Sequence, residues 1–160
     1  MIRAALPDDA DAVRAIVQDA YGHYVARIGM RPGPMRDDYD RRIDAGQVWV
    51  LQEDGEIVGL VVLEDQPDAL LLDNVAVAPA AQGKGFGRAL IAFAEAEALR
   101  RGYGELWLYT HVLMVENIAL YTRLGFAEIG RVGEKGFQRV YMAKRLQETR
   151  PESGGRGLPA

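Results

Sequence analysis

Apolar residues recur along the chain with two periods, one typical of helices and one typical of strands. After "PDDAD", where Asp8 or Asp9 can cap a helix, apolar side chains repeat every three or four positions. They are Val13, Ile16, Val17, Ala20, Tyr21 and Tyr24. Two runs rich in β-branched residues flank the turn "EDGE" and predict a hairpin over "QVWVLQEDGEIVGLVVLE". The run "LLLDNVAVA" is almost continuously apolar, which favours a central strand.

The remaining segments extend this pattern to both ends of the chain. They are a short strand "MIRAAL", a loop over residues 27–35, a polar helix from Asp37 to Ala45, a helix from Phe86 to Arg101, a strand "ELWLYT", a short helix "ENIALYTRL" and a hairpin of "FAEIGRV" and "FQRVYMAKRL" around "GEKG". The order β-α-α-β-β-β-α-β-α-β-β predicts an α/β (α+β) protein, with a mixed, mostly antiparallel sheet of about seven strands flanked by helices. We expect one domain over residues 1–146 and a flexible tail over residues 147–160.

Composition places the chain among ordinary soluble domains. It has 160 residues, of which 49% are hydrophobic and 26% charged, and its formal net charge is −4. Cysteine is absent, and no segment approaches the ~20 apolar residues of a membrane helix. The acidic balance argues against a general nucleic-acid binder. We therefore expect a cytoplasmic protein without a nucleic-acid or membrane partner.

The residues that are missing also narrow the chemistry. The only serine is Ser153, within the expected tail, so a Ser or Cys nucleophile is disfavoured. His23 and His111 are far apart and have no second His or Cys at ligand spacing, so we expect no metal site. Activity would rest on backbone groups, carboxylates, tyrosine and one histidine.

Three glycines at alternate positions, Gly83, Gly85 and Gly87, stand between the apolar strand and a helix. The first backbone N–H groups of a helix have no intrahelical acceptor, and the helix dipole is positive there. Because glycine lacks Cβ, an anion can approach these nitrogens closely, and Lys84 and Arg88 add positive charge. A glycine-rich turn without any ligand remains the alternative.

The spacing of the glycines can be compared with three patterns of nucleotide-binding sites. A P-loop needs glycine five residues before the Gly-Lys pair, where Ala78 stands, and Ser or Thr after it, where Gly85 stands. The dinucleotide pattern G-x-G-x-x-G/A meets Arg88 or Leu90 at its last position. The pattern that fits is Q-x-x-G-x-G, which begins at Gln82 directly after "VAVAP".

This turn resembles the acetyl-CoA pyrophosphate site of the GNAT superfamily of N-acetyltransferases. The element order over residues 1–146 is similar to that fold, and "LYTRLGF", Leu120 to Phe126, resembles the second cofactor motif of the family. The resemblance implies the GNAT fold and acetyl-CoA as donor. The cofactor-binding residues that it implies are Val75, Ala76, Val77, Gln82, Gly83, Lys84, Gly85, Phe86, Gly87, Arg88, Asn117 and Tyr121.

The resemblance also implies an activity, which is direct transfer of the acetyl group to a primary amine of a small molecule or of a peptide or protein N-terminus. A backbone N–H within Val75–Val77 would meet the thioester carbonyl, and Tyr121 would be the general acid for the departing thiolate. The alternatives are a plain buried strand and a packing role for Tyr121. A further alternative is a CoA-binding sensor or interaction module without turnover.

Two assignments stay open. Many family members carry Asn seven residues before the tyrosine, where this chain has Met114, so Asn117 is either a cofactor contact or a helix-start residue. The general-base candidates are Asp73, His111 and Glu134, and water or another group is the alternative. Asp73 lies an even number of positions before Val75 and Val77, so we expect it on their face of the strand.

The acceptor is less visible in the sequence. The segment from Arg27 to Arg42 contains five arginines and three aspartates, in a region that covers the acceptor side in the resembling family. A solvated face is favoured, and an arginine that binds a substrate carboxylate is the alternative. The amine itself is not identified, and a homodimer is left open.

Overall fold

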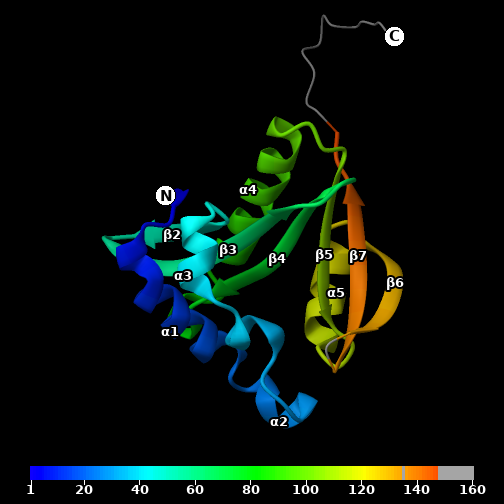
Figure 1. Cartoon of the computed structure of the whole chain (residues 1–160), viewed down its shortest axis with the longest axis horizontal. Helices are drawn as coiled ribbons and strands as arrows, with labels where there is room; N and C mark the ends of the chain where they lie inside the picture. Colours follow the sequence, from blue (N-terminus) through cyan, green and yellow to red (C-terminus); the bar gives the residue numbers. More distant parts are fainter. Residues whose placement is uncertain (135, 148–160) are drawn as a thin grey trace, which may run out of the picture.

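The computed structural model describes residues 1–134 and 136–147 (Figure 1). The tail expected over residues 147–160 lies, from residue 148 on, outside the described residues. The strands are β1 Ile2–Ala4, β2 Val48–Glu53, β3 Glu56–Asp65, β4 Leu70–Val77, β5 Glu105–His111, β6 Ala127–Glu134 and β7 Phe137–Arg145. They form one sheet in the order β1-β2-β3-β4-β5-β7-β6. β4 and β5 are parallel, and the other neighbouring pairs are antiparallel, which confirms the predicted mixed sheet.

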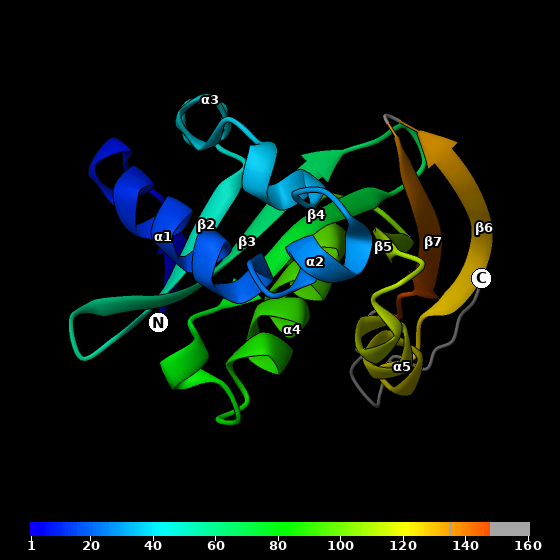
Figure 2. The ribbon, with the colours of Figure 1, turned by 90° about the horizontal axis from the view of Figure 1, so that it is seen from below.

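Helices cover both faces of this sheet (Figure 2). They are α1 Ala10–Tyr21, α2 Tyr24–Ile28, α3 Tyr39–Asp44, α4 Phe86–Arg100 and α5 Val115–Arg123. One buried cluster joins α4 to the sheet through residues such as Leu63, Leu72 and Leu90. A second joins α1 and α3 to the other face through Val17 and Val62. None of the helices in the described part of the chain is long and apolar enough to cross a membrane.

The segment between α1 and α3 differs from the predicted loop. α1 ends at Tyr21, and a separate short helix, α2, runs into residues predicted to be loop. Gly29, at φ +89°, ends α2, because this left-handed conformation suits glycine. A 3₁₀ turn, η2 Gly33–Arg36, follows, and Asp38 then caps α3 by accepting the Arg41 N–H at 3.2 Å.

A bulge interrupts β4 beside the centre of the sheet. Val62 of β3 faces Asn74 and Leu63 faces Leu72, so Asp73 is an extra residue in the ladder. A bulge disturbs the two-residue alternation of a strand. Residues before and after Asp73 therefore do not share faces in the simple way that their spacing predicts.

Candidate functional site

The two parallel strands separate halfway along their length. β4 pairs with β5 only through Leu70–Leu72. Beyond that point β4 stays with β3 as far as Val77, while β5 stays with β7 as far as His111. The main-chain groups of β4 that face the opening have lost their strand partner, so they must find other partners.

Two side chains contact the main-chain carbonyl groups of β4 at this opening. The Tyr21 hydroxyl lies 3.0 Å from the Val75 carbonyl oxygen and 2.6 Å from Asn74 Oδ1. Gln82 Nε2 donates to the Val77 carbonyl oxygen at 3.1 Å. In an extended strand the N–H and C=O of one residue point the same way. The N–H groups of Val75 and Val77 therefore also face the opening.

The glycine turn connects this strand to α4. Gly83 and Gly85 both have φ +84°, which a residue with Cβ adopts only with strain. Gly85 is the residue before the helix, and the first intrahelical bond of α4 is from Ala89 N–H to the Gly85 carbonyl. No described side chain caps the helix, and its first turn holds no acidic residue. Three backbone N–H groups, from Phe86 to Arg88, are thus directed outward beside a positive dipole end.

A groove of about 440 Å³ runs from this turn to α5. It is lined by Ala20, Tyr21, His23, Tyr24, Val75, Ala76, Val77, Ala81, Gln82, Gly83, Gly85, Phe86, Gly87, Arg88, Ile91, Glu116, Asn117, Leu120, Tyr121 and Leu124. This set includes every predicted cofactor residue except Lys84, which is exposed outside the lining. Segments from both halves of the chain thus form one continuous surface.

Tyr121 lies at the inner end of the groove. Its ring packs against Phe126, with the centroids 6.0 Å apart, and its side chain is buried. Burial, and to a smaller degree Tyr24, raise the pKa of Tyr121 to about 12, so the phenol is neutral and can donate a proton. No hydrogen bond among the described residues involves this hydroxyl. A buried hydroxyl without a protein partner is available to a ligand.

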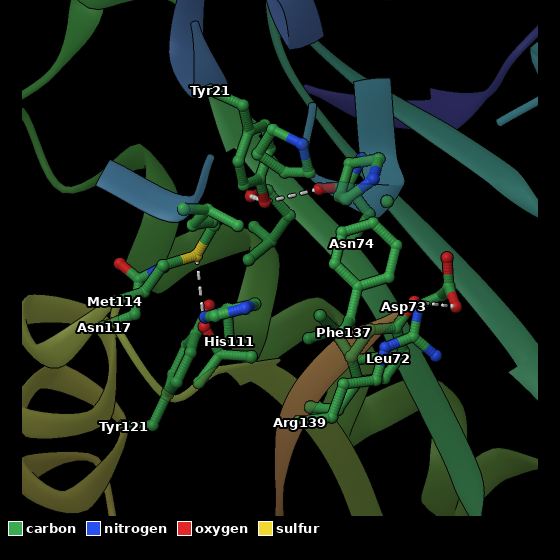
Figure 3. Close-up of a pocket in the computed structure, with 17 residues that line it drawn as sticks. Tyr21, Leu72, Asp73, Asn74, His111, Met114, Asn117, Tyr121, Phe137 and Arg139 are labelled. Carbon is green, nitrogen blue, oxygen red and sulfur yellow. Dashed lines mark hydrogen bonds between the residues drawn. The ribbon is translucent and has the colours of Figure 1, made fainter. Parts of the chain in front are cut away.

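A small cavity of about 40 Å³ continues from Tyr121 into the opening between the strands (Figure 3). His111, Asn117 and Arg139 also line this junction pocket. Asn117 is the third residue of α5, and its Nδ2 lies 3.6 Å from the sulfur of Met114, the residue before the helix. Its side chain thus takes part in the start of the helix and also lines the groove. Met114 precedes α5 and is buried, with its sulfur 3.4 Å from Thr110 Oγ1.

Beyond the junction lies an outer pocket of about 550 Å³ on the side of the sheet that faces α3. Its lining contains Trp107, Tyr109, Phe137 and Tyr141 together with charged residues. The outer pocket and the groove are separate cavities, and the junction pocket shares lining residues with both. Two molecules approaching from opposite sides could therefore meet at Tyr121.

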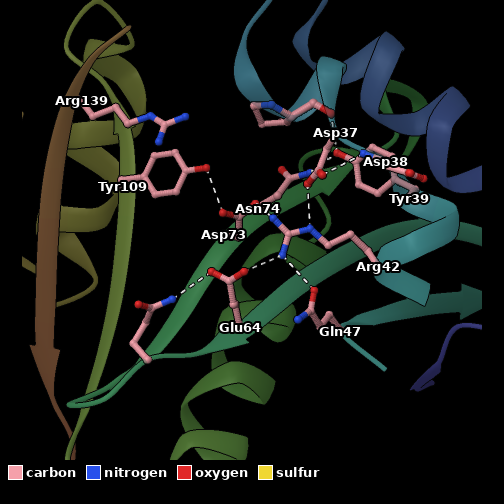
Figure 4. Close-up of polar contacts among 12 residues, drawn as sticks. Asp37, Asp38, Tyr39, Arg42, Gln47, Glu64, Asp73, Asn74, Tyr109 and Arg139 are labelled. Atoms are coloured by element: carbon pink, nitrogen blue, oxygen red, sulfur yellow. Dashed lines mark hydrogen bonds and ion pairs between the residues drawn. The ribbon is translucent and has the colours of Figure 1, made fainter. Parts of the chain in front are cut away.

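Arg42 organises the charges of the outer pocket (Figure 4). Its guanidinium contacts Asp37 at 2.9 Å, Glu64 at 3.1 Å and Asp73 at 3.3 Å, and its side chain is only 10% exposed. Gln47 accepts a further hydrogen bond at 2.9 Å. The expectation of a solvated arginine face is thus wrong for Arg42, because α3 turns this residue onto the sheet.

A model of the acetyltransferase (GNAT) family matches residues 10–126, which is more than half of the chain. The chain belongs to the GNAT family. Mycothiol acetyltransferase of Jonesia denitrificans is 32% identical over 132 residues, which cover 77% of this chain and 41% of that protein. The chain spans about half or less of the length of the curated relatives that it matches.

Solved GNAT structures share the fold of this chain. The ribosomal-protein-S18-alanine N-acetyltransferase from Escherichia coli has a TM-score of 0.70 at 23% identity and covers 95% of this chain and 97% of its own. The PaiA N-acetyltransferase from Thermoplasma acidophilum, solved in complex with coenzyme A, has a TM-score of 0.74 at 17% identity and covers 91% and 98%. These likenesses establish the GNAT fold.

In this GNAT chain the bulge moves Asp73 away from its predicted face. Val75 and Val77 pack against the cluster beneath α4, whereas Asp73 contacts Arg42 of α3 on the other side of the sheet. The expectation that the three share a face is therefore wrong, since it assumed an uninterrupted strand. Asp73 nevertheless lines the junction pocket, as well as the outer pocket. Burial raises its pKa, against the opposing effects of Arg42 and of the Tyr109 hydroxyl, which donates to Asp73 at 2.9 Å.

The other two base candidates lie in different surroundings. His111 lines the junction pocket, where burial and then the charge of Arg139 lower its pKa. Its Nδ1 accepts the Leu113 N–H at 3.1 Å, so in the neutral ring Nε2 carries the proton. Glu134 lines none of the three cavities and accepts the Tyr141 hydroxyl at 2.6 Å.

Several lining residues carried no sequence signal of their role. Tyr21 fitted a helical core pattern, yet its hydroxyl reaches β4. Arg139 occupies an ordinary strand position, and only the fold places it between the junction and the outer pocket. Arg27 bonds Glu116 across from α2 to α5, which lowers the Glu116 pKa to about 2. No local pattern could pair these two residues, because they are 89 positions apart.

Proposed function

We propose that this GNAT protein is an acetyl-CoA-dependent N-acetyltransferase that transfers the acetyl group directly to a primary amine of a small molecule or of a peptide or protein N-terminus. The observation that carries the proposal is the single groove that joins the uncapped start of α4 to Tyr121 through the open edge of β4. Family membership and the coenzyme A bound to a protein of the same fold support it.

The groove offers acetyl-CoA a suitable set of donors. The outward N–H groups from Phe86 to Arg88, the glycines of the turn and the Arg88 side chain would hold the diphosphate. Gln82 fixes the turn to the end of β4 through the Val77 carbonyl. Asn117, at the other wall, would contact the pantetheine arm.

Bound acetyl-CoA supplies a thioester whose carbonyl carbon bonds the amine nitrogen and whose sulfur leaves as a thiolate. The N–H of Val75 would donate to the carbonyl oxygen as negative charge develops there. Tyr121 would donate its proton to the departing sulfur, for which a neutral phenol is required. With no cysteine in the chain and the only serine outside the described residues, direct transfer is the simplest route.

The proton of the attacking amine needs an acceptor, and we assign this role to Asp73. Its carboxylate reaches the junction pocket and the outer pocket, where the amine would enter, and its raised pKa makes it a better base. The pH dependence of kcat/KM for Asp73→Asn, His111→Gln and Glu134→Gln tests this assignment. We expect the loss of rate on the acidic side, which reports protonation of the general base, to disappear only in Asp73→Asn. Its persistence there would contradict the assignment.

The decisive experiment measures acetyl-CoA binding and turnover separately. Calorimetry reports binding, and release of free CoA thiol with a panel of primary amines reports transfer. We expect both. Binding without thiol release for any amine would identify a sensor or interaction module, and the lack of any acetyl-CoA binding would contradict the proposed function altogether.

A further inference from the structure

Two oppositely charged side chains, those of Arg139 and Asp73, both contact Tyr109. The Tyr109 ring lies 4.2 Å from the Arg139 guanidinium carbon, and the Tyr109 hydroxyl donates to Asp73 at 2.9 Å. Both charged side chains line the junction pocket and the outer pocket. Tyr109 therefore contacts a cation with its ring face and an anion with its hydroxyl, at the place where the acceptor would enter.

Resting on the proposed function, we propose that the acceptor is an α-amino carboxylate, whose amino group lies at Asp73 while its carboxylate binds Arg139. The planar guanidinium fork matches a carboxylate in a bidentate manner. The amino group of such a molecule is two bonds from its carboxyl carbon. The two charges of the substrate thus face two opposite charges of the protein.

Arg139 is built into the site rather than extended into solvent. Its side chain is 12% exposed, and its guanidinium carbon also makes a cation–π contact with Phe137, 5.5 Å from the ring centroid. Gly33 makes room for it, because a Cβ at that position would come within 3.3 Å of Arg139 Nη2. Arg139 Nη1 forms an ion pair with Glu134 at 3.4 Å, and the Tyr141 hydroxyl is a second polar neighbour of the guanidinium. A guanidinium has five N–H donors, so this ion pair uses only part of them.

The same charge disfavours other acceptors. The Arg139 charge reaches the junction, where it adds to the effect of burial in lowering the pKa of His111. An ammonium group without a nearby anion, as in a polyamine, would meet this repulsion uncompensated. A peptide N-terminus would present a neutral amide where the carboxylate belongs. The remaining volume of the outer pocket, walled by Trp107 and Tyr141, can hold the amino-acid side chain.

The test compares each of the twenty free amino acids with its amide as acceptor, by thiol release with saturating acetyl-CoA. We expect kcat/KM for the preferred free acid to exceed that for its amide by at least tenfold. Arg139→Met should lower kcat/KM for the acid by about 30-fold or more, as expected when one partner of a desolvated charge pair is removed. The amide should change less than threefold. Arg139→Lys, which keeps the charge and loses the fork, should fall between the wild type and Arg139→Met.

The control is Arg145→Met, an exposed arginine at the far end of the same strand, which should leave the acid-to-amide ratio unchanged. The inference would be overturned if the wild type had equal kcat/KM values for acid and amide, or if Arg139→Met lowered both values equally. In either case, turnover of acetyl-CoA would still support the proposed function. If nothing is turned over, titration of free amino acids into the CoA-loaded protein decides. No saturable binding then overturns the inference, whereas binding that Arg139→Met abolishes supports it.

Discussion

The groove and the outer pocket lie next to each other but are built in opposite ways. The groove is lined mainly by backbone and by apolar or small side chains, and much of it comes from the continuous stretch of residues 75–91. The outer pocket draws charged and aromatic side chains from α3, β3, β4, β5 and β7. A surface of backbone groups suits a ligand common to a family, whereas a surface of side chains can change its ligand without changing the fold.

The two regions also differ in how their polar groups are satisfied. At the start of α4 the first N–H groups have no acceptor among the described residues, which suits an anion. In the outer pocket three carboxylates already converge on Arg42. We therefore expect a ligand to satisfy the polar groups of the groove, whereas the outer pocket is held in shape by its own ion pairs.

The largest expected effect comes from breaking that ion-pair cluster. Arg42→Met leaves Asp37, Glu64 and Asp73 without their cation, so the free energy of unfolding should fall by about 3–5 kcal/mol. Urea denaturation measures the loss. The neighbouring, exposed Arg41 is the matched control, and Arg41→Met should stay within about 0.5 kcal/mol of the wild type. Similar stabilities for the two variants would show that the cluster does not hold the pocket.

Next in size is the effect of Tyr121→Phe on turnover. Removing the phenol proton donor should lower kcat by on the order of ten- to a thousandfold and leave acetyl-CoA affinity nearly intact. Thiol release and calorimetry measure the two quantities. Tyr103→Phe, which removes an exposed hydroxyl bonded to Asp65, is the control. Normal turnover in Tyr121→Phe would reduce this residue to core packing.

A smaller effect tests the backbone character of the groove. Gly85→Ala and Gly102→Ala both place Cβ on a left-handed residue next to α4, at φ +84° and +88°, with no atom within 4 Å. Each should cost about 1–2 kcal/mol of stability. Only Gly85→Ala should weaken acetyl-CoA binding, on the order of tenfold, which corresponds to about 1.4 kcal/mol. Equal acetyl-CoA affinities of the two variants would show that the glycine turn does not contribute to acetyl-CoA binding.

The smallest effect concerns pH. Burial and Arg139 lower the pKa of His111 in the folded protein below the ordinary value of about 6.5. The unfolded chain takes up this proton first as pH falls, so stability declines as pH drops through about 6.5 and levels off below the folded pKa. Chemical denaturation between about pH 7.5 and 5 should show a weaker decline in His111→Gln than in the wild type. Parallel curves would contradict the burial of this ring at the junction.

Local patterns predicted many of the residues that line the groove, because most of them are close together in the sequence. The glycine turn, the start of α4 and the following tyrosine motif depend on backbone conformation and short-range spacing, which a sequence displays directly. The hairpins and the order of the elements follow from the same rules. The boundary of α2 escaped prediction because "RIGMRPGPM" contains breakers that also mark short helical turns.

The outer pocket could not be derived in this way. Asp73 changes face because of one bulge, and a bulge depends on how β3 and β4 pair rather than on β4 alone. Arg42 and Arg139 meet their partners only after strands distant in sequence come together. The sequence by itself determined where backbone groups are left without partners, since that follows from local conformation. Only the tertiary structure decided which charges face one another, because those distances are set by the packing of the whole sheet.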